Sequence, residues 1–217
     1  MSRKPRSRRK PSRTLLVAAG FALLATAAFL YVAIERLERP RSGPDSGGEQ
    51  TTVAIGGPFA LTDQKGTPRT DADFRGRLML VYFGYSFCPD VCALTLSNMG
   101  AALDRLGDKA DEVTPIFITI DPERDTVARL AEYAKNFTPR LVALTGTKEQ
   151  IAAAAKAYHV YYARNDEAGG KDYLMDHTSI IYLMDRQGRY LAHFGHTATV
   201  DRMMVEIGKY LWSAPKG

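Results

Sequence analysis

Two kinds of hydrophobic pattern divide this chain. Residues 14–34 form a stretch of twenty-one residues without a charged side chain, whereas short apolar runs alternate with polar segments from residue 53 onward. About twenty consecutive apolar residues are enough for a helix to span a membrane. Short apolar runs separated by polar segments are typical of a folded domain. We therefore expect one membrane anchor followed by one domain.

The apolar runs of the domain predict strands that alternate with helices. Strands are expected at 78–85, 113–120 and 141–144, and helices at 91–106, 125–136 and 147–158. A strand, a helix and a strand in series imply a parallel crossover between the two strands. The first six elements are therefore expected to build a sheet with parallel strands and helices packed on it.

The end of the domain has a different pattern. Residues 179–184 and 190–194 are apolar or alternating runs separated by a short segment that contains Gly188, which predicts an antiparallel hairpin. A last helix over 200–211 should bury one face. Parallel strands followed by a hairpin, with helices between them, predict a mixed α/β sheet flanked by helices, of the thioredoxin-like class.

The start of the chain is strongly basic. The formal net charge is +5, but the first thirteen residues carry seven basic side chains and no acidic one, which leaves −2 on the remainder. Because the basic arm runs directly into the apolar stretch, we expect it to flank a membrane span and to bind no nucleic acid. Such a positive flank usually stays on the cytoplasmic side.

These observations predict four segments. We interpret 1–13 as a cytoplasmic arm, 14–34 as a transmembrane anchor, 35–52 as a flexible linker and 53–217 as the folded domain. The linker contains two prolines and three glycines between residues 39 and 50. The domain should lie on the periplasmic side of a bacterial inner membrane. A cleaved signal peptide is the alternative, but the apolar stretch is longer than usual and lacks a clear small-x-small cleavage site.

The two cysteines of the chain, Cys88 and Cys92, follow the first predicted strand directly. At the start of a helix, the helix dipole and unpaired backbone N–H groups favour a thiolate over a thiol. A spacing of four residues lets the two sulfurs converge on one side of the helix. Thiolates bind soft metals and exchange disulfides. The usual redox motif has two residues between its cysteines and this one has three, so both roles remain open.

A third metal ligand is needed to complete a site, and His177 is the candidate. It precedes the strand expected from residue 179, and a loop at that end of a central strand can approach the thiols in a thioredoxin-like sheet. We interpret the other histidines, His159, His193 and His196, as structural or surface residues. Two thiolates and one imidazole suit copper and could also accept zinc.

The segment 121–125, Asp-Pro-Glu-Arg-Asp, follows the second predicted strand at the same edge of the sheet. We expect Asp125 to cap the next helix. Asp121 and Arg124 are weaker candidates to organise the site.

Several short sequence motifs of this chain occur together in one known family. They are 57–59 with Leu61 and Asp63, 82–85, Cys88-Pro89-Asp90-Val91-Cys92, 121–125, 138–140, 144–147 and 176–178. Across residues 55–211 the chain resembles the Sco/SenC proteins. The resemblance implies a membrane-tethered, thioredoxin-like protein that handles copper for the binuclear copper centre of cytochrome c oxidase. It also implies that Cys88, Cys92 and His177 bind the copper ion, as Cu(I) or Cu(II).

The resemblance leaves two functions to weigh. The first is a copper chaperone, not an enzyme, whose partner is cytochrome c oxidase subunit II and which meets other periplasmic copper chaperones and thiol reductants. The alternative is a thiol:disulfide oxidoreductase that uses Cys88 and Cys92 as its redox pair to keep the target cysteines reduced. A peroxidase is disfavoured because Tyr85 stands where that class has threonine. Ala93 and Phe87 depart from the family pattern without removing a ligand.

Overall fold

The computed structural model of the 217-residue chain describes residues 26, 30, 54–166 and 173–212. The predicted arm, most of the predicted anchor and the predicted linker lie outside these described residues. Of the anchor, Thr26 and Leu30 are described, and both are helical. A search of the described residues finds no helix with the length and apolar character that a membrane crossing requires.

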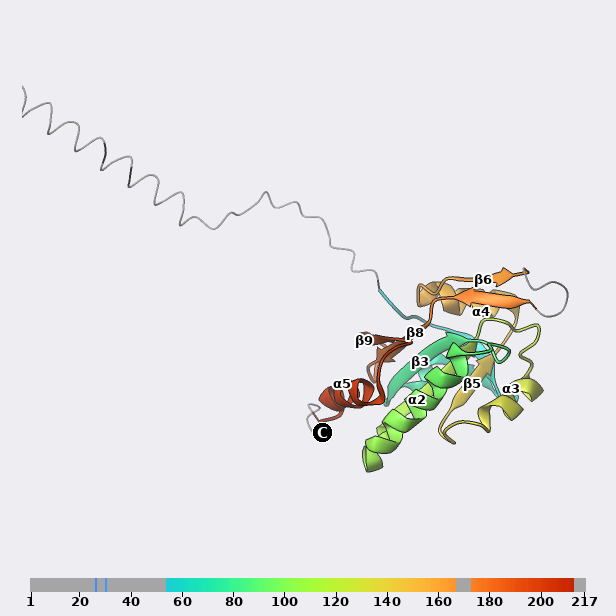
Figure 1. The fold of residues 1–217 in the computed structure, drawn as a ribbon, viewed down its shortest axis with the longest axis horizontal. Coiled ribbons are helices and arrows are strands. Elements are labelled where there is room, and N and C mark those ends of the chain that lie inside the picture. Colours follow the sequence, from blue (N-terminus) through green and yellow to red (C-terminus); the bar gives the residue numbers. More distant parts are fainter. Residues whose placement is uncertain (1–25, 27–29, 31–53, 167–172, 213–217) are drawn as a thin grey trace, which may run out of the picture. The chain divides into compact units, whose positions relative to one another are not determined.

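Nine strands, four α-helices and two short 3-10 helices make up the described part of the domain (Figure 1). The strands are β1 (Ala60–Asp63), β2 (Pro68–Thr70), β3 (Leu78–Gly84), β4 (Val113–Thr119), β5 (Val142–Thr145), β6 (Tyr162–Asn165), β7 (Leu174–His177), β8 (Ile180–Met184) and β9 (Tyr190–Gly195). The helices are α2 (Val91–Arg105), α3 (Val127–Ala134), α4 (Lys148–Ala157) and α5 (Val200–Trp212), and the 3-10 helices are η1 (Asp71–Phe74) and η2 (Gly107–Glu112).

Seven of the strands form one mixed sheet in the order β2-β1-β5-β4-β3-β8-β9. β3 lies inside this sheet, parallel to β4 on one side and antiparallel to β8 on the other. The parallel β3–β4–β5 unit and the β8–β9 hairpin confirm the mixed α/β arrangement predicted from the hydrophobic pattern. β6 and β7 form a separate two-stranded antiparallel sheet, which the pattern did not predict.

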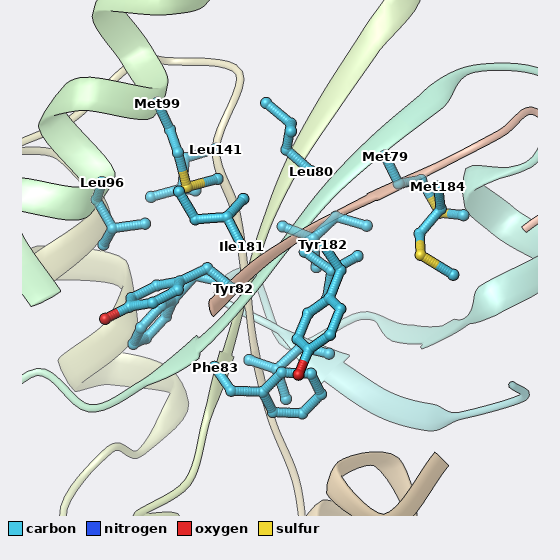
Figure 2. Packing of buried hydrophobic residues seen from close by; sticks show 14 of the residues in the cluster. Met79, Leu80, Tyr82, Phe83, Leu96, Met99, Leu141, Ile181, Tyr182 and Met184 are labelled. Carbon is cyan, nitrogen blue, oxygen red and sulfur yellow. The ribbon is translucent and has the colours of Figure 1, made fainter. Parts of the chain in front are cut away.

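The core lies on both faces of β3, whose seven residues are all buried. Successive side chains of a strand point to opposite faces. Figure 2 shows Tyr82 on the side of Leu96 from α2, and Phe83 next to Tyr182 from β8. The Phe83 ring also packs against Tyr158 at the end of α4, with ring centroids 5.3 Å apart. Helices therefore cover both faces of the sheet.

Parallel pairing brings the carboxyl ends of β3 and β4 to the same edge. The N–H of Ile120, just after β4, donates to the carbonyl of Gly84, the last residue of β3, over 2.8 Å. The segment after β3 carries the two cysteines, and the segment after β4 carries Asp121 to Asp125. The fold thus places both motifs side by side, as the sequence predicted.

Candidate metal centre

The two cysteines lie where β3 passes into α2. The N–H of Cys88 donates to the carbonyl of Tyr85 over 3.3 Å, which folds the segment into a turn. α2 then begins at Val91 with Asp90 as its N-cap residue, so Cys92 occupies the first turn. Both thiols are free, Cys88 half-buried and Cys92 buried. This is the placement at the start of a helix that the predicted helix over 91–106 implied.

His177 reaches the cysteines from the last position of β7. Its Nε2 lies 3.6 Å from the Sγ of Cys92, although the two residues are 85 positions apart. Its Nδ1 lies 3.2 Å from the carbonyl oxygen of Thr178, an acceptor that requires the proton on Nδ1. Nε2 is therefore the nitrogen that faces the thiols, in the tautomer that leaves it free to bind a metal.

Aromatic side chains hold the imidazole and the buried thiol in place. The rings of Tyr82 and Tyr85 contact His177 edge to face, at centroid distances of 6.2 and 6.0 Å. The hydroxyl of Tyr82 also donates to the Sγ of Cys92 over 3.6 Å, and burial raises the pKa of this tyrosine. Tyr82 therefore stays protonated and acts as a hydrogen-bond donor to the inner sulfur.

The two thiols differ in their acidity. Hydrogen bonding from the Cys92 thiol is the largest cause that lowers the pKa of Cys88; burial opposes it, and hydrogen bonds from the backbone N–H groups of Asp90 and Cys92 add to it. The same bond to Cys88, together with burial, raises the pKa of Cys92. At neutral pH the outer sulfur is therefore a thiolate and the inner one carries a proton.

A network from the segment after β4 anchors the strand that carries His177. The buried carboxylate of Asp121 accepts hydrogen bonds from Arg124 over 2.5 Å and from the hydroxyl of Tyr173 over 2.8 Å. Arg124 in turn donates to the carbonyl of Tyr173 over 2.9 Å and lies over its ring. Tyr173 directly precedes β7. Asp121 and Arg124 thus organise the site through the β6–β7 hairpin.

Asp125 does not cap the following helix, so that prediction is wrong. Thr126 is the N-cap residue of α3, and its side chain accepts from the N–H of Arg129. Asp125 is fully buried instead and accepts hydrogen bonds from the N–H and the hydroxyl of Ser86 and from the hydroxyl of Thr119. A buried carboxylate needs several donors, and the two adjacent strand ends supply them.

The other three histidines show no contact with either cysteine in the described part of the chain. His159 follows α4 and approaches the carbonyl of Ala54, His193 lies on β9 beside the hydroxyl of Tyr190, and His196 is exposed after β9. Within the described ranges, no group of three or more His, Cys, Asp and Glu side chains is already arranged to hold a metal ion.

Comparison with known proteins identifies the relatives of this chain. Residues 47–212 match the sequence model of SCO1/SenC proteins. The chain belongs to the SCO1/SenC family. It is 43% identical over 208 residues to the mitochondrial SCO1 homologue of Mus musculus, covering 94% of this chain and 72% of the relative. The human SCO1 homologue is 41% identical over 159 residues, and the match spans 53% of its length and 72% of this chain.

Solved SCO1/SenC structures share the fold. The structure of Bradyrhizobium japonicum ScoI with copper bound is 43% identical, with a TM-score of 0.68 over 72% of this chain and 99% of that chain. Yeast Sco1 with copper bound is 36% identical, with a TM-score of 0.69 over 75% of this chain and 92% of that chain. These matches confirm the thioredoxin-like class.

Several residues around the thiols could not be assigned from the SCO1/SenC motifs alone. Tyr82 and Tyr85 belong to the motif 82–85, but the apolar run around them predicts only a buried strand and does not indicate that their rings contact His177. The sequence did not indicate a role for Ser86, because its hydrogen-bond partner Asp125 is 39 positions away. Only the proximity of two strand ends in a parallel sheet could have suggested this pair.

Proposed function

We propose that this protein is a membrane-anchored copper chaperone that delivers copper to the binuclear copper site of cytochrome c oxidase subunit II. Copper is the cargo in this proposal, and Cys88, Cys92 and His177 are its ligands. The domain would act on the periplasmic side of the inner membrane. The copper-bound structures of two relatives, Bradyrhizobium japonicum ScoI and yeast Sco1, support copper as the metal.

The distance between Cys92 and His177 carries the proposal. With bond lengths of about 2.3 Å to sulfur and about 2.0 Å to nitrogen, as in zinc sites, two such ligands of one ion lie about 3.5–3.8 Å apart. The observed separation of 3.6 Å between Sγ and Nε2 falls within this range. Thiolate and imidazole donors suit copper. A shift of the half-buried Cys88 toward the pair would complete a three-ligand site.

The acidity of the two thiols favours a second function, a thiol:disulfide oxidoreductase. The thiolate of the more accessible Cys88 would attack a target disulfide and release one target thiol. Cys92 would then attack the mixed disulfide, leaving a Cys88–Cys92 disulfide and the second target thiol. Two electrons pass to the target, and an external thiol reductant must restore the pair.

The role of His177 separates the two functions. Copper retention needs the third ligand, whereas disulfide exchange needs only the two sulfurs. In cells that carry His177→Ala and grow at low copper, a chaperone should lose oxidase activity and the copper of subunit II. The purified variant should still reduce disulfides.

Two control variants belong to this experiment. Cys88→Ser should fail in both assays, and His196→Ala, at an exposed position after β9, should behave as the parent does. Full oxidase maturation with His177→Ala would exclude the chaperone in favour of the reductase.

The anchor and the periplasmic side need a separate test. Protease added to spheroplasts should digest the domain, while the full-length chain stays in the membrane fraction. A protected domain, or a shortened soluble form in the periplasm, would contradict this topology.

A further inference from the structure

Phe87, directly before Cys88, is an exposed aromatic residue beside the thiolate. Its side chain is 46% exposed, although large apolar residues usually avoid water. The preceding residue, Ser86, is buried and held by Asp125, so the backbone at this point is fixed. Any protein that takes copper from Cys88, or whose disulfide Cys88 attacks, must come within one residue of this ring.

Two guanidinium groups contact the Phe87 ring. The Cζ atoms of Arg124 and Arg129 each lie 4.8 Å from the ring centroid, within the range of a cation–π interaction. Arg124 is itself fixed by Asp121 and by the Tyr173 ring. The ring is therefore held in one place, which reduces the entropy that a binding partner must overcome. We call Phe87, Arg124 and Arg129 the Phe87 patch.

The Phe87 patch carries a positive charge that the described chain leaves unpaired. Asp121 forms an ion pair with Arg124. Arg129 is exposed and donates from Nε to the neutral hydroxyl of Ser86 over 2.9 Å. In the parts of the chain that the structure describes, no carboxylate forms an ion pair with Arg129. The patch thus offers an apolar ring next to a free cation.

We propose that the Phe87 patch is the docking surface for the copper acceptor, and that the acceptor presents an apolar side chain and a carboxylate next to its own copper ligands. This inference rests on the proposed function and adds the chemistry of the partner. Aromatic residues and arginine are enriched in the cores of protein interfaces. The exposed Asp90 lies two residues after Cys88, so opposite charges flank the outer sulfur and would orient the acceptor.

The test measures binding of the full chain, purified in detergent and loaded with copper, to the soluble copper domain of oxidase subunit II from the same organism. Phe87→Ala should weaken binding by more than about fivefold, the change that separates residues contributing to an interface from neutral ones. Phe87→Tyr keeps the ring and should bind within about twofold of the parent. Arg129→Gln should slow association and reduce its salt dependence, because the charge steers the encounter.

Matched control variants lie on α5. Val205 is 53% exposed and Arg202 is exposed, so Val205→Ala removes an exposed apolar group and Arg202→Gln removes a positive charge on a different element from the thiols. Both should bind as the parent does. Copper per chain is measured in every variant.

The outcomes separate the docking surface from the proposed function. If the parent binds and both Phe87→Ala and Arg129→Gln bind equally well, the docking surface is wrong and the chaperone function stands. The docking surface is also wrong if affinity falls only together with bound copper. If the copper-loaded parent does not bind subunit II at all, both proposals fail.

Discussion

The carboxylate of Asp125 binds Ser86 twice, through the backbone N–H over 2.9 Å and through the hydroxyl over 2.5 Å. The two residues belong to different segments, one after β4 and one after β3, and Ser86 stands two positions before Cys88. This pair therefore fixes the backbone that leads to the outer thiolate.

Replacing Asp125 should destabilise the domain. In Asp125→Ala, the N–H and hydroxyl of Ser86 and the hydroxyl of Thr119 lose their acceptor. An unsatisfied buried donor costs about 1–3 kcal/mol, so the loss should be about 3 kcal/mol or more. Thermal unfolding measures it. Asp104→Ala, at an exposed position of α2, is the control and should stay within about 0.5 kcal/mol. Equal stability of the two variants would contradict the role of Asp125.

Gly84 leaves room for the inner sulfur. A Cβ atom at this position would lie 2.9 Å from the Sγ of Cys92 and 3.1 Å from the rings of Phe117 and Tyr82. Overpacking of this kind costs about 1–3 kcal/mol, so Gly84→Ala should lower the melting temperature. Gly195→Ala is the control, because no atom lies within 4 Å of its added Cβ. A Gly84→Ala chain as stable as the control would show that the sulfur can move freely.

The two thiols should react differently with iodoacetamide as pH changes. A lowered pKa keeps Cys88 a thiolate below the pH at which a free cysteine, with a pKa of about 8.5, becomes protonated. The reduced, metal-free chain should therefore be modified first at Cys88, and still be modified at pH values near 6. Peptide mapping identifies the site. Cys92→Ser should move the reaction to higher pH, because Cys92 is the largest cause of the shift. Preferential modification of Cys92 would reverse the assignment.

Copper binding should depend on the redox state of the chain. A Cys88–Cys92 disulfide removes two of three proposed ligands, and thiolates are the metal-binding form. The reduced chain should bind about one copper ion, the capacity of a single soft-ligand site. The oxidised chain should bind far less, as measured by metal analysis after gel filtration. Equal uptake by both forms would place the copper elsewhere.

The sequence predicted the parts of the site that depend on local pattern. The apolar run before Cys88 predicted β3, and the helix expected from residue 91 placed Cys92 in the first turn of α2. The helix expected over 147–158 also matches α4, which begins with a capping box formed by Thr147 and Gln150. Each signal lies within a few residues of the feature it predicts.

The parts that depend on distant contacts could not be predicted in the same way. β6 and β7 are four residues each and only partly buried, so they carry no strong alternation, and His177 was expected in an irregular segment. Asp125 precedes a helix, which favours a cap, but burial against Ser86 overrides that preference. Phe87 was noted only as a departure from the family pattern, because Arg124 and Arg129 approach it through the fold.

The candidate site is built from two separate structural units, because His177 lies on the β6–β7 sheet and the cysteines do not. The sulfurs belong to the central β3–α2 unit, whereas the imidazole belongs to a hairpin whose strands pair only with each other among the described strands. Local opening of such a hairpin costs less free energy than opening a central strand. Under the proposed function, the imidazole could thus detach while the two sulfurs stay in place, and a bound ion could pass to an acceptor by exchanging one bond at a time.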